Sequence, residues 1–201
     1  MAGFFSLSVI ADEGMWLPQL LKTMNESDMQ AHGLQMTAED LYSVNNSSLK
    51  DAIVSLGGFC TAEMISSEGL MLTNHHCAFG SIQEHSSVSN DYIKDGFWAM
   101  SRDEELVNEG LTASFLVSIE EVTARVLAEL TDDMTEKERS AKIREISTTI
   151  VDEKTEDTHY NARVKSFFGG NDFYIMTYET FKDVRLVGAP PSAIGKFGGD
   201  T

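Results

Sequence analysis

The chain has 201 residues, of which 42% are hydrophobic, and this is enough apolar material for a packed core. It carries 32 acidic and 15 basic residues, which give a formal net charge of −17. Phosphate backbones and anionic lipid surfaces repel a chain of this charge, so we expect no nucleic acid among its partners.

The amino terminus has the composition of an export signal. Residues 1–11 are apolar with small residues, and Val9-Ile10-Ala11 before Asp12 fits a signal-peptidase site, although no Lys or Arg precedes it. We interpret 1–11 as a signal-peptide remnant that is cleaved after Ala11; the alternative is a frayed mature terminus. No run reaches the roughly 18 apolar residues of a membrane span.

The first third of the mature chain predicts short helices. Residues 14–24 have a proline near the first turn and apolar residues at helical spacing. Residues 37–42 begin with Thr37 as a cap, followed by acids in the first turn, so a short helix is expected there. Residues 49–56 fit either a strand or a short helix.

A β-hairpin follows, and its end carries the most reactive side chains. Two runs of strand formers, 59–66 and 69–73, are joined by a turn at 67–69. The second run ends at His75-His76-Cys77, so we expect an imidazole at a strand end, where a scaffold can aim it into a cleft. Successive strand-end residues point to different sides, so only one of these histidines can face a given cleft.

Strands and helices alternate in the rest of the chain. Residues 78–87 form a polar, glycine-punctuated stretch that predicts a loop, and 91–100 concentrates aromatic residues that we expect in a cleft wall. The remaining expected elements are a strand at 111–119, helices at 120–130 and 135–151, and strands at 162–168, 173–179 and 183–187.

Five sequence words indicate a family: Ser48-Leu49-Lys50-Asp51-Ala52, the run from Gly69 to Cys77, Gly80-Ser81-Ile82-Gln83, Asp95-Gly96-Phe97-Trp98-Ala99-Met100, and the run from Asp183 to Ser192. In this order they resemble the bacterial dipeptidyl-peptidase 7 and 11 family, secreted serine exopeptidases that remove dipeptides from peptide amino termini. Cys60 with His76-Cys77 also resembles the first hairpin of chymotrypsin-like serine proteases. The resemblance covers about residues 12–201, but only the first part of the family's length.

The resemblance implies a mainly β fold with helical additions, a chymotrypsin-like or trypsin-like double β-barrel. Residues 12–201 would hold the first barrel and part of the linkage to the rest of the peptidase domain. The family further implies oligopeptide substrates, no cofactor, a homodimeric parent protein and a periplasmic, secreted or cell-surface location in a bacterium. Acidic-selective and hydrophobic-selective members share these amino-terminal words.

The resemblance also assigns roles to residues of this chain. His76, directly before Cys77, matches the general base of a His-Asp-Ser triad, and Cys60 and Cys77 match a disulfide. A neutral imidazole can take the proton of a serine hydroxyl near neutral pH when a carboxylate holds its tautomer. For His75 an ordinary structural role is favoured.

The other triad residues are expected outside this chain. The family's aspartate lies shortly beyond Thr201 and its serine far beyond, so Asp200 is not assigned as catalytic and the fragment alone is expected to be inactive. There is no Gly-x-Ser-Gly motif, and the serines considered as nucleophiles are interpreted as turn or surface residues: Ser47, Ser66, Ser81 and Ser86.

Two other functions compete with this hypothesis. A metal site could use His75, His76, Cys77 and His85, but adjacent ligands rarely reach one ion and no Cys-x-x-Cys or His-Glu-x-x-His motif is present. The chain could also be an inactive protease-like domain that binds or merely folds. In an exported chain two cysteines favour a disulfide, and a count of free thiols separates the disulfide from a metal site.

Overall fold

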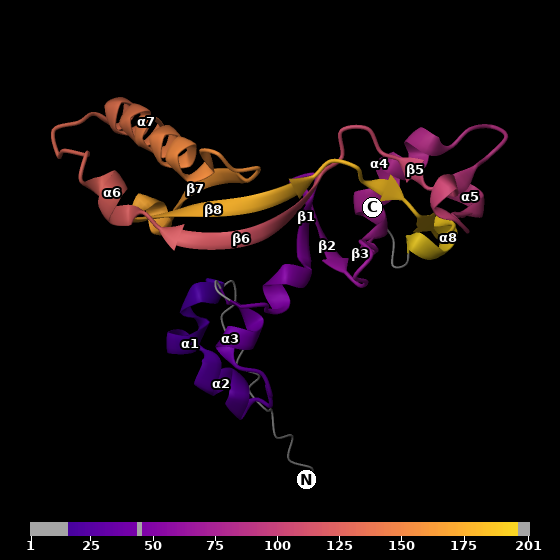
Figure 1. Cartoon of the computed structure of the whole chain (residues 1–201), viewed down its shortest axis with the longest axis horizontal. Helices are drawn as coiled ribbons and strands as arrows, with labels where there is room; N and C mark the ends of the chain where they lie inside the picture. The colour runs from indigo at the N-terminus through magenta and orange to yellow at the C-terminus, as the bar shows by residue number, and fades with distance from the viewer. Residues whose placement is uncertain (1–15, 44–45, 197–201) are drawn as a thin grey trace, which may run out of the picture.

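A six-stranded antiparallel sheet forms the centre of the computed structural model, which describes residues 16–43 and 46–196 (Figure 1). The strand order is β3-β2-β1-β6-β8-β7, and two small ladders join β4 to β10 and β5 to β9. The strands are β1 Ile53–Leu56, β2 Cys60–Met64, β3 Met71–Thr73, β4 Phe97–Trp98, β5 Leu106–Val107, β6 Ala113–Glu121, β7 Asn161–Phe167, β8 Asp172–Phe181, β9 Arg185–Leu186 and β10 Gly188–Ala189. Within the described residues β3 and β7 are free edges, so the expected sheet-rich fold with helices is confirmed, but these residues form no closed barrel.

Helices cover both faces of this sheet. The α-helices are α1 Leu21–Met24, α2 Glu26–Ala31, α3 Ala38–Leu41, α4 His75–His85, α5 Tyr92–Asp95, α6 Thr123–Leu127, α7 Glu136–Thr155 and α8 Ser192–Gly195. Single 3₁₀ turns occur at η1 Pro18–Leu20, η2 Leu49–Ala52, η3 Arg102–Glu104 and η4 Phe168–Gly170. Figure 1 shows α7 on one side of β6 and β8 and α1 to α3 on the other. None of the helices in the described ranges is long and apolar enough to cross a membrane.

The short helices before the sheet follow their local capping signals. Pro18 opens η1, which runs directly into α1, as expected for the part of 14–24 that is described. Thr37 caps α3 in a reciprocal capping box with Asp40. The two alternatives for 49–56 both hold, because η2 is followed immediately by β1.

The predicted hairpin forms the first half of the sheet. β2 pairs with both β1 and β3, and Gly57 turns the chain between β1 and β2 with a φ of 60°. One face of these strands packs into a core whose buried members come from β1, β2, β6 and the segment before β9: Val54, Leu56, Ala62, Ala113 and Val184. β6 thereby joins the hairpin to the rest of the sheet.

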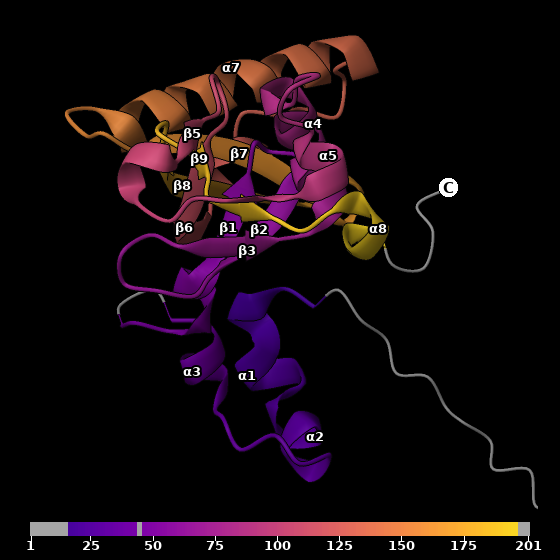
Figure 2. The ribbon, with the colours of Figure 1, turned by 90° about the vertical axis from the view of Figure 1, so that its right-hand side faces the viewer.

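The expected loop at 78–87 is wrong, because most of it belongs to helix α4. Ala78 and Ile82 are spaced one helical turn apart, and both pack in a core with Leu186 and Ala189. Ile82 is 1% exposed, so this burial outweighs the weak helix propensity of Gly80. Figure 1 shows α4 gathered with α5 and α8 at one end of the long axis, and Figure 2 shows this end facing the viewer.

The second half of the sheet supports the longest helix. The helix expected at 135–151 is α7, and Thr135 and Glu138 form a capping box at its start. Buried side chains of α6, α7 and β8 form one core: Val126, Ile146, Ile150, Phe173 and Ile175. The helix expected from residue 120 begins only at Thr123, because Glu120 and Glu121 still pair with β8.

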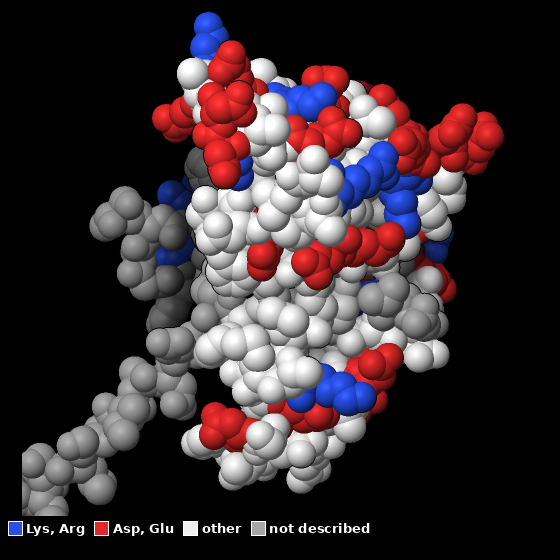
Figure 3. Space-filling model, turned by 90° about the vertical axis from the view of Figure 1, so that its left-hand side faces the viewer, with Lys and Arg blue, Asp and Glu red and all other residues white. Residues whose placement is uncertain are grey.

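Acidic side chains gather at the end of the molecule that carries α6 and α7, with lysines and arginines between them (Figure 3). This distribution agrees with the net charge of −17. The expected signal-peptide remnant at 1–11 and Asp200 lie outside the described residues.

Candidate active site

The candidate site lies where the edge strand β3 gives way to α4. Thr73 ends the strand, and its hydroxyl donates a hydrogen bond to the Thr61 carbonyl oxygen at 2.8 Å. Asn74 keeps extended backbone angles, and its carbonyl accepts the Cys77 N–H at 3.0 Å, which closes the first helical turn. The histidine pair therefore starts a helix, and the expectation that it ends a strand is wrong.

The two imidazoles enter different surroundings. Neighbouring residues of an α-helix point about 100° apart, so His75 and His76 diverge as they start α4. The His75 ring is partly buried; its Nε2 lies 3.4 Å from Ser192 Oγ, and its centroid lies 5.9 Å from that of Phe79. His76 is exposed, and the described part of the chain supplies no hydrogen-bond partner to its ring.

A disulfide joins the turn that bears His76 to the sheet. Cys60 at the start of β2 and Cys77 in the first turn of α4 have their sulfur atoms 1.99 Å apart and their Cα atoms 6.0 Å apart. A ring nitrogen of His76 and both sulfur atoms lie within 4.8 Å of one another, so the imidazole sits beside the disulfide. The link tethers the residue that follows His76 directly.

The structure does not assemble the four ligands of the alternative metal site. His75 faces α8, and His85 lies at the other end of α4, where its Nε2 is 3.1 Å from Asn108 Oδ1. In the described ranges only Cys60, His76 and Cys77 come close enough to share an ion, and two of these are bonded to each other.

Two of the serines considered as nucleophiles make local backbone contacts. Ser66 Oγ accepts the N–H groups of Glu68 and Leu70 in the turn between β2 and β3. Ser86 Oγ donates to the Ile82 carbonyl at the end of α4. Both contacts are typical of turns and helix ends, as the sequence suggested.

The contact between His75 and Ser192 was not foreseen. It brings a serine hydroxyl toward an imidazole, as in a serine–histidine dyad, but the separation of 3.4 Å is long and His75 Nδ1 is buried without a hydrogen-bond partner in the described residues. A catalytic histidine needs an acceptor at that nitrogen to hold its tautomer, so this pair lacks the third member of a triad. Ser192 belongs to a sequence word that indicated the family, but no sequence signal links it to His75.

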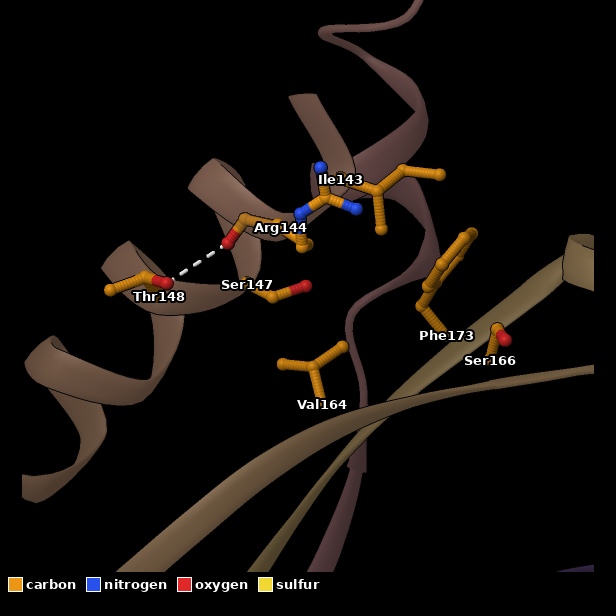
Figure 4. A pocket seen from close by; sticks show the side chains of 7 residues that line it. All are labelled: Ile143, Arg144, Ser147, Thr148, Val164, Ser166 and Phe173. Atoms are coloured by element: carbon orange, nitrogen blue, oxygen red, sulfur yellow. Dashed lines mark hydrogen bonds between the residues drawn. The ribbon is translucent and has the colours of Figure 1, made fainter. Parts of the chain in front are cut away.

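A groove also lies away from the histidines. It has a volume of about 380 Å³ and lies between α7 and the strands β7 and β8 (Figure 4). Its lining combines apolar side chains, hydroxyls and one arginine: Ile143, Arg144, Ser147, Thr148, Val164, Ser166 and Phe173. Figure 1 places α7 and α4 toward opposite ends of the long axis, so this groove is separate from the candidate site.

The aromatic segment 91–100 packs beside α4. Tyr92 and Phe97 have ring centroids 4.9 Å apart and contact the core around Ile82. Trp98 covers Gly188 on β10 and remains 67% exposed. The segment thus packs against α4 and leaves the Trp98 indole at the surface.

Comparison with known proteins decides the family. The model of the Peptidase S46 family matches residues 11–201, nearly the entire chain. The chain belongs to the peptidase S46 family. An Asp/Glu-specific dipeptidyl-peptidase from Flavobacterium psychrophilum is 51% identical over 94% of this chain, and a dipeptidyl-peptidase 7 from Capnocytophaga gingivalis is 48% identical over 100% of it.

A solved structure has a similar fold over most of this chain. Porphyromonas endodontalis DPP11 in complex with the dipeptide Arg-Glu matches 93% of the chain with a TM-score of 0.79 and 43% sequence identity. The chain spans 26% and 28% of the length of the two curated relatives and 28% of the DPP11 chain. These three proteins therefore contain long further segments that the chain does not match.

Proposed function

We propose that this chain is the amino-terminal part of a serine dipeptidyl-peptidase and that His76 is its general base and then its general acid. The observation that best supports this is the placement of His76 in a chain of the S46 family. Its ring is exposed at the first turn of α4 and lies beside the Cys60–Cys77 disulfide, while both of its neighbours are held by other elements.

The proposed reaction hydrolyses the bond between the second and third residues of an oligopeptide with a free amino terminus. A serine from a further segment attacks the carbonyl carbon while His76 accepts its proton. The carbon–nitrogen bond then breaks, and His76 gives that proton to the leaving amine. Water attacks the dipeptidyl ester, His76 takes a proton from the water and returns one to the serine, and the dipeptide leaves.

A carboxylate and oxyanion donors would complete this site. The carboxylate would hold the tautomer of His76, and N–H donors would stabilise the negative oxygen of the tetrahedral intermediate. No cofactor is required by this sequence of steps. We assign the aspartate and the serine to segments beyond Thr201, as the family resemblance implies.

For the fold, we propose a chymotrypsin-like double barrel whose first barrel is contributed by this chain. Three features support it: the hairpin strands pack one face into a core, β6 carries a register shift between Leu116 and Ser118 of the kind that bends a strand, and the edges β3 and β7 are free in the described residues. Large exposed apolar side chains favour contact with further chain: Phe59, Trp98, Met100 and Ile194.

The same proposal includes export and dimerisation of the parent protein. A disulfide persists in an oxidising compartment, so the Cys60–Cys77 link supports a periplasmic, secreted or cell-surface location. The homodimer rests on the family resemblance alone.

The function is tested with the gene product extended to its natural end. Chromogenic dipeptides with a free amino terminus and an acidic or apolar second residue should release their chromophore, and amino-terminally acetylated counterparts should not. Equal cleavage of blocked substrates would contradict an exopeptidase. No cleavage of either set, by correctly folded protein, would favour the alternative of a non-catalytic binding domain.

A further inference from the structure

The two residues that flank His76 are tethered to different parts of the fold. Cys77 is bonded to Cys60 on β2, and His75 contacts α8 through Ser192. His76 itself is exposed between them. The backbone that carries the proposed general base is therefore held from both sides, and its position depends on both tethers.

The contact between His75 and α8 depends on a close approach of Gly195, in α8, to the His75 ring. A Cβ atom built on Gly195 would lie 2.1 Å from His75 Cδ2 and 2.8 Å from its Cγ, far inside van der Waals contact. The φ of Gly195 is not positive, so glycine is needed here for space rather than for backbone conformation. Any side chain at this position would push α8 and the His75 ring apart.

Stability alone does not explain an imidazole in this place. His75 Nδ1 is buried with no hydrogen-bond partner in the described residues, and its other nitrogen makes a single long contact of 3.4 Å. A buried polar atom without a partner costs free energy that an apolar ring would avoid. The ring nevertheless lies close to both Phe79 and Gly195.

We propose that His75 is a positioning residue for the reaction: it docks the first turn of α4 on α8 and thereby fixes the place of His76. The inference rests on the proposed function, because it concerns the placement of that general base. His75 and His76 share a peptide bond, so a shift of the docked ring moves the backbone of the base. A misplacement of a catalytic group by about 1 Å can reduce the rate about 100-fold.

The test is a double-mutant cycle in the full-length gene product, with His75→Ala, Gly195→Ala and the two combined. Each single variant should lower kcat about 10- to 100-fold and leave KM within about twofold, because neither changes a substrate contact. The double variant should be no slower than His75→Ala, because the added methyl group then occupies the space of the missing ring. Gly80→Ala is the matched control, since no atom lies within 4 Å of its added Cβ.

Turnover is expressed per folded molecule, and a thermal unfolding curve shows that each variant is folded. If His75→Ala does not fold, Ser192→Ala removes only the hydroxyl and should lower kcat about two- to tenfold. Wild-type kcat in both Ser192→Ala and Gly195→Ala would overturn the proposal, as would losses that multiply in the double variant. An inactive wild type would overturn the proposed function and this inference with it, whereas an active wild type with unchanged His75→Ala overturns this inference alone.

Discussion

Removal of the Cys60–Cys77 link should destabilise the chain by an amount that the length of the closed loop sets. The two cysteines are 17 residues apart in sequence, and closing a loop of this length removes entropy from the unfolded chain. In the chain-entropy model this corresponds to about 3 kcal/mol at 25 °C. Replacing both cysteines by serine should therefore raise the unfolding equilibrium constant about 100-fold.

Two measurements check this expectation. Thiol titration of the oxidised, denatured chain should find no free thiol. In urea unfolding, the free energy of unfolding of the Cys60→Ser/Cys77→Ser variant should be about 3 kcal/mol lower than that of the wild type. Wild type reduced with dithiothreitol is the matched control and should unfold like the variant. Two free thiols after chelation and denaturation would refute the disulfide and favour a metal site, and an unfolding free energy unchanged by the double substitution would refute the loop-closure estimate.

Three further predictions concern the contacts of α7 and the isolated chain. The Lys154 ammonium donates a hydrogen bond to Glu120 and lowers the pKa of that carboxyl below its ordinary value of 4.5. The contact therefore stabilises the folded chain fully above pH 4.5, and this stabilisation is lost as the pH falls through the lowered pKa of the folded state. Glu120→Gln should thus lower the free energy of unfolding by about 0.5 kcal/mol at pH 7, since solvent screens the pair, and should not change it in strong acid. An equal loss at both pH values in urea unfolding would contradict this prediction. Thr135→Ala removes the hydroxyl that accepts the Glu138 N–H and should lower the free energy of unfolding by about 1 kcal/mol. Thr148→Ala, at an exposed residue inside α7, is the control and should change that free energy less. The 201-residue chain alone should release no dipeptide, because it offers the base without nucleophile or oxyanion donors, and His76-dependent turnover by the purified chain would show that the serine lies within it.

Elements with local signals could be predicted from the sequence. The capping box at Thr135 and Glu138 marks the start of α7, and two runs of strand formers joined by a hairpin-length turn predicted the pairing of β2 with β3. In both cases the interactions that decide the structure join residues close together in the chain.

Helix α4 was missed because its decisive contacts are remote. Gly80 and the polar residues around it favour a loop, yet Ile82 packs against Leu186 and Ala189 about a hundred residues later in the chain. Sequence patterns within a short window do not contain that partner, and the burial it provides exceeds the propensity cost of a single glycine.

In the candidate site, too, residues with local sequence signals could be predicted, whereas contacts between distant segments could not. His76 and the two cysteines could be selected from their sequence context, whereas the role of the neighbouring histidine could not. His75 meets Ser192 across 117 residues, and the need for glycine at 195 is visible only from the approach of α8. The free edges β3 and β7 likewise follow from strand pairing among distant segments.

The most direct test of the central claim is turnover by His76→Ala in the full-length gene product, compared with wild type and with His75→Ala. Loss of the general base should reduce dipeptide release to near background while the thermal unfolding curve is preserved, because an exposed ring is removed from a turn that the disulfide still holds. The His75→Ala variant should retain measurable turnover. Near-normal dipeptide release by folded His76→Ala, or an equally complete loss in folded His75→Ala, would contradict the assignment of His76 as the general base.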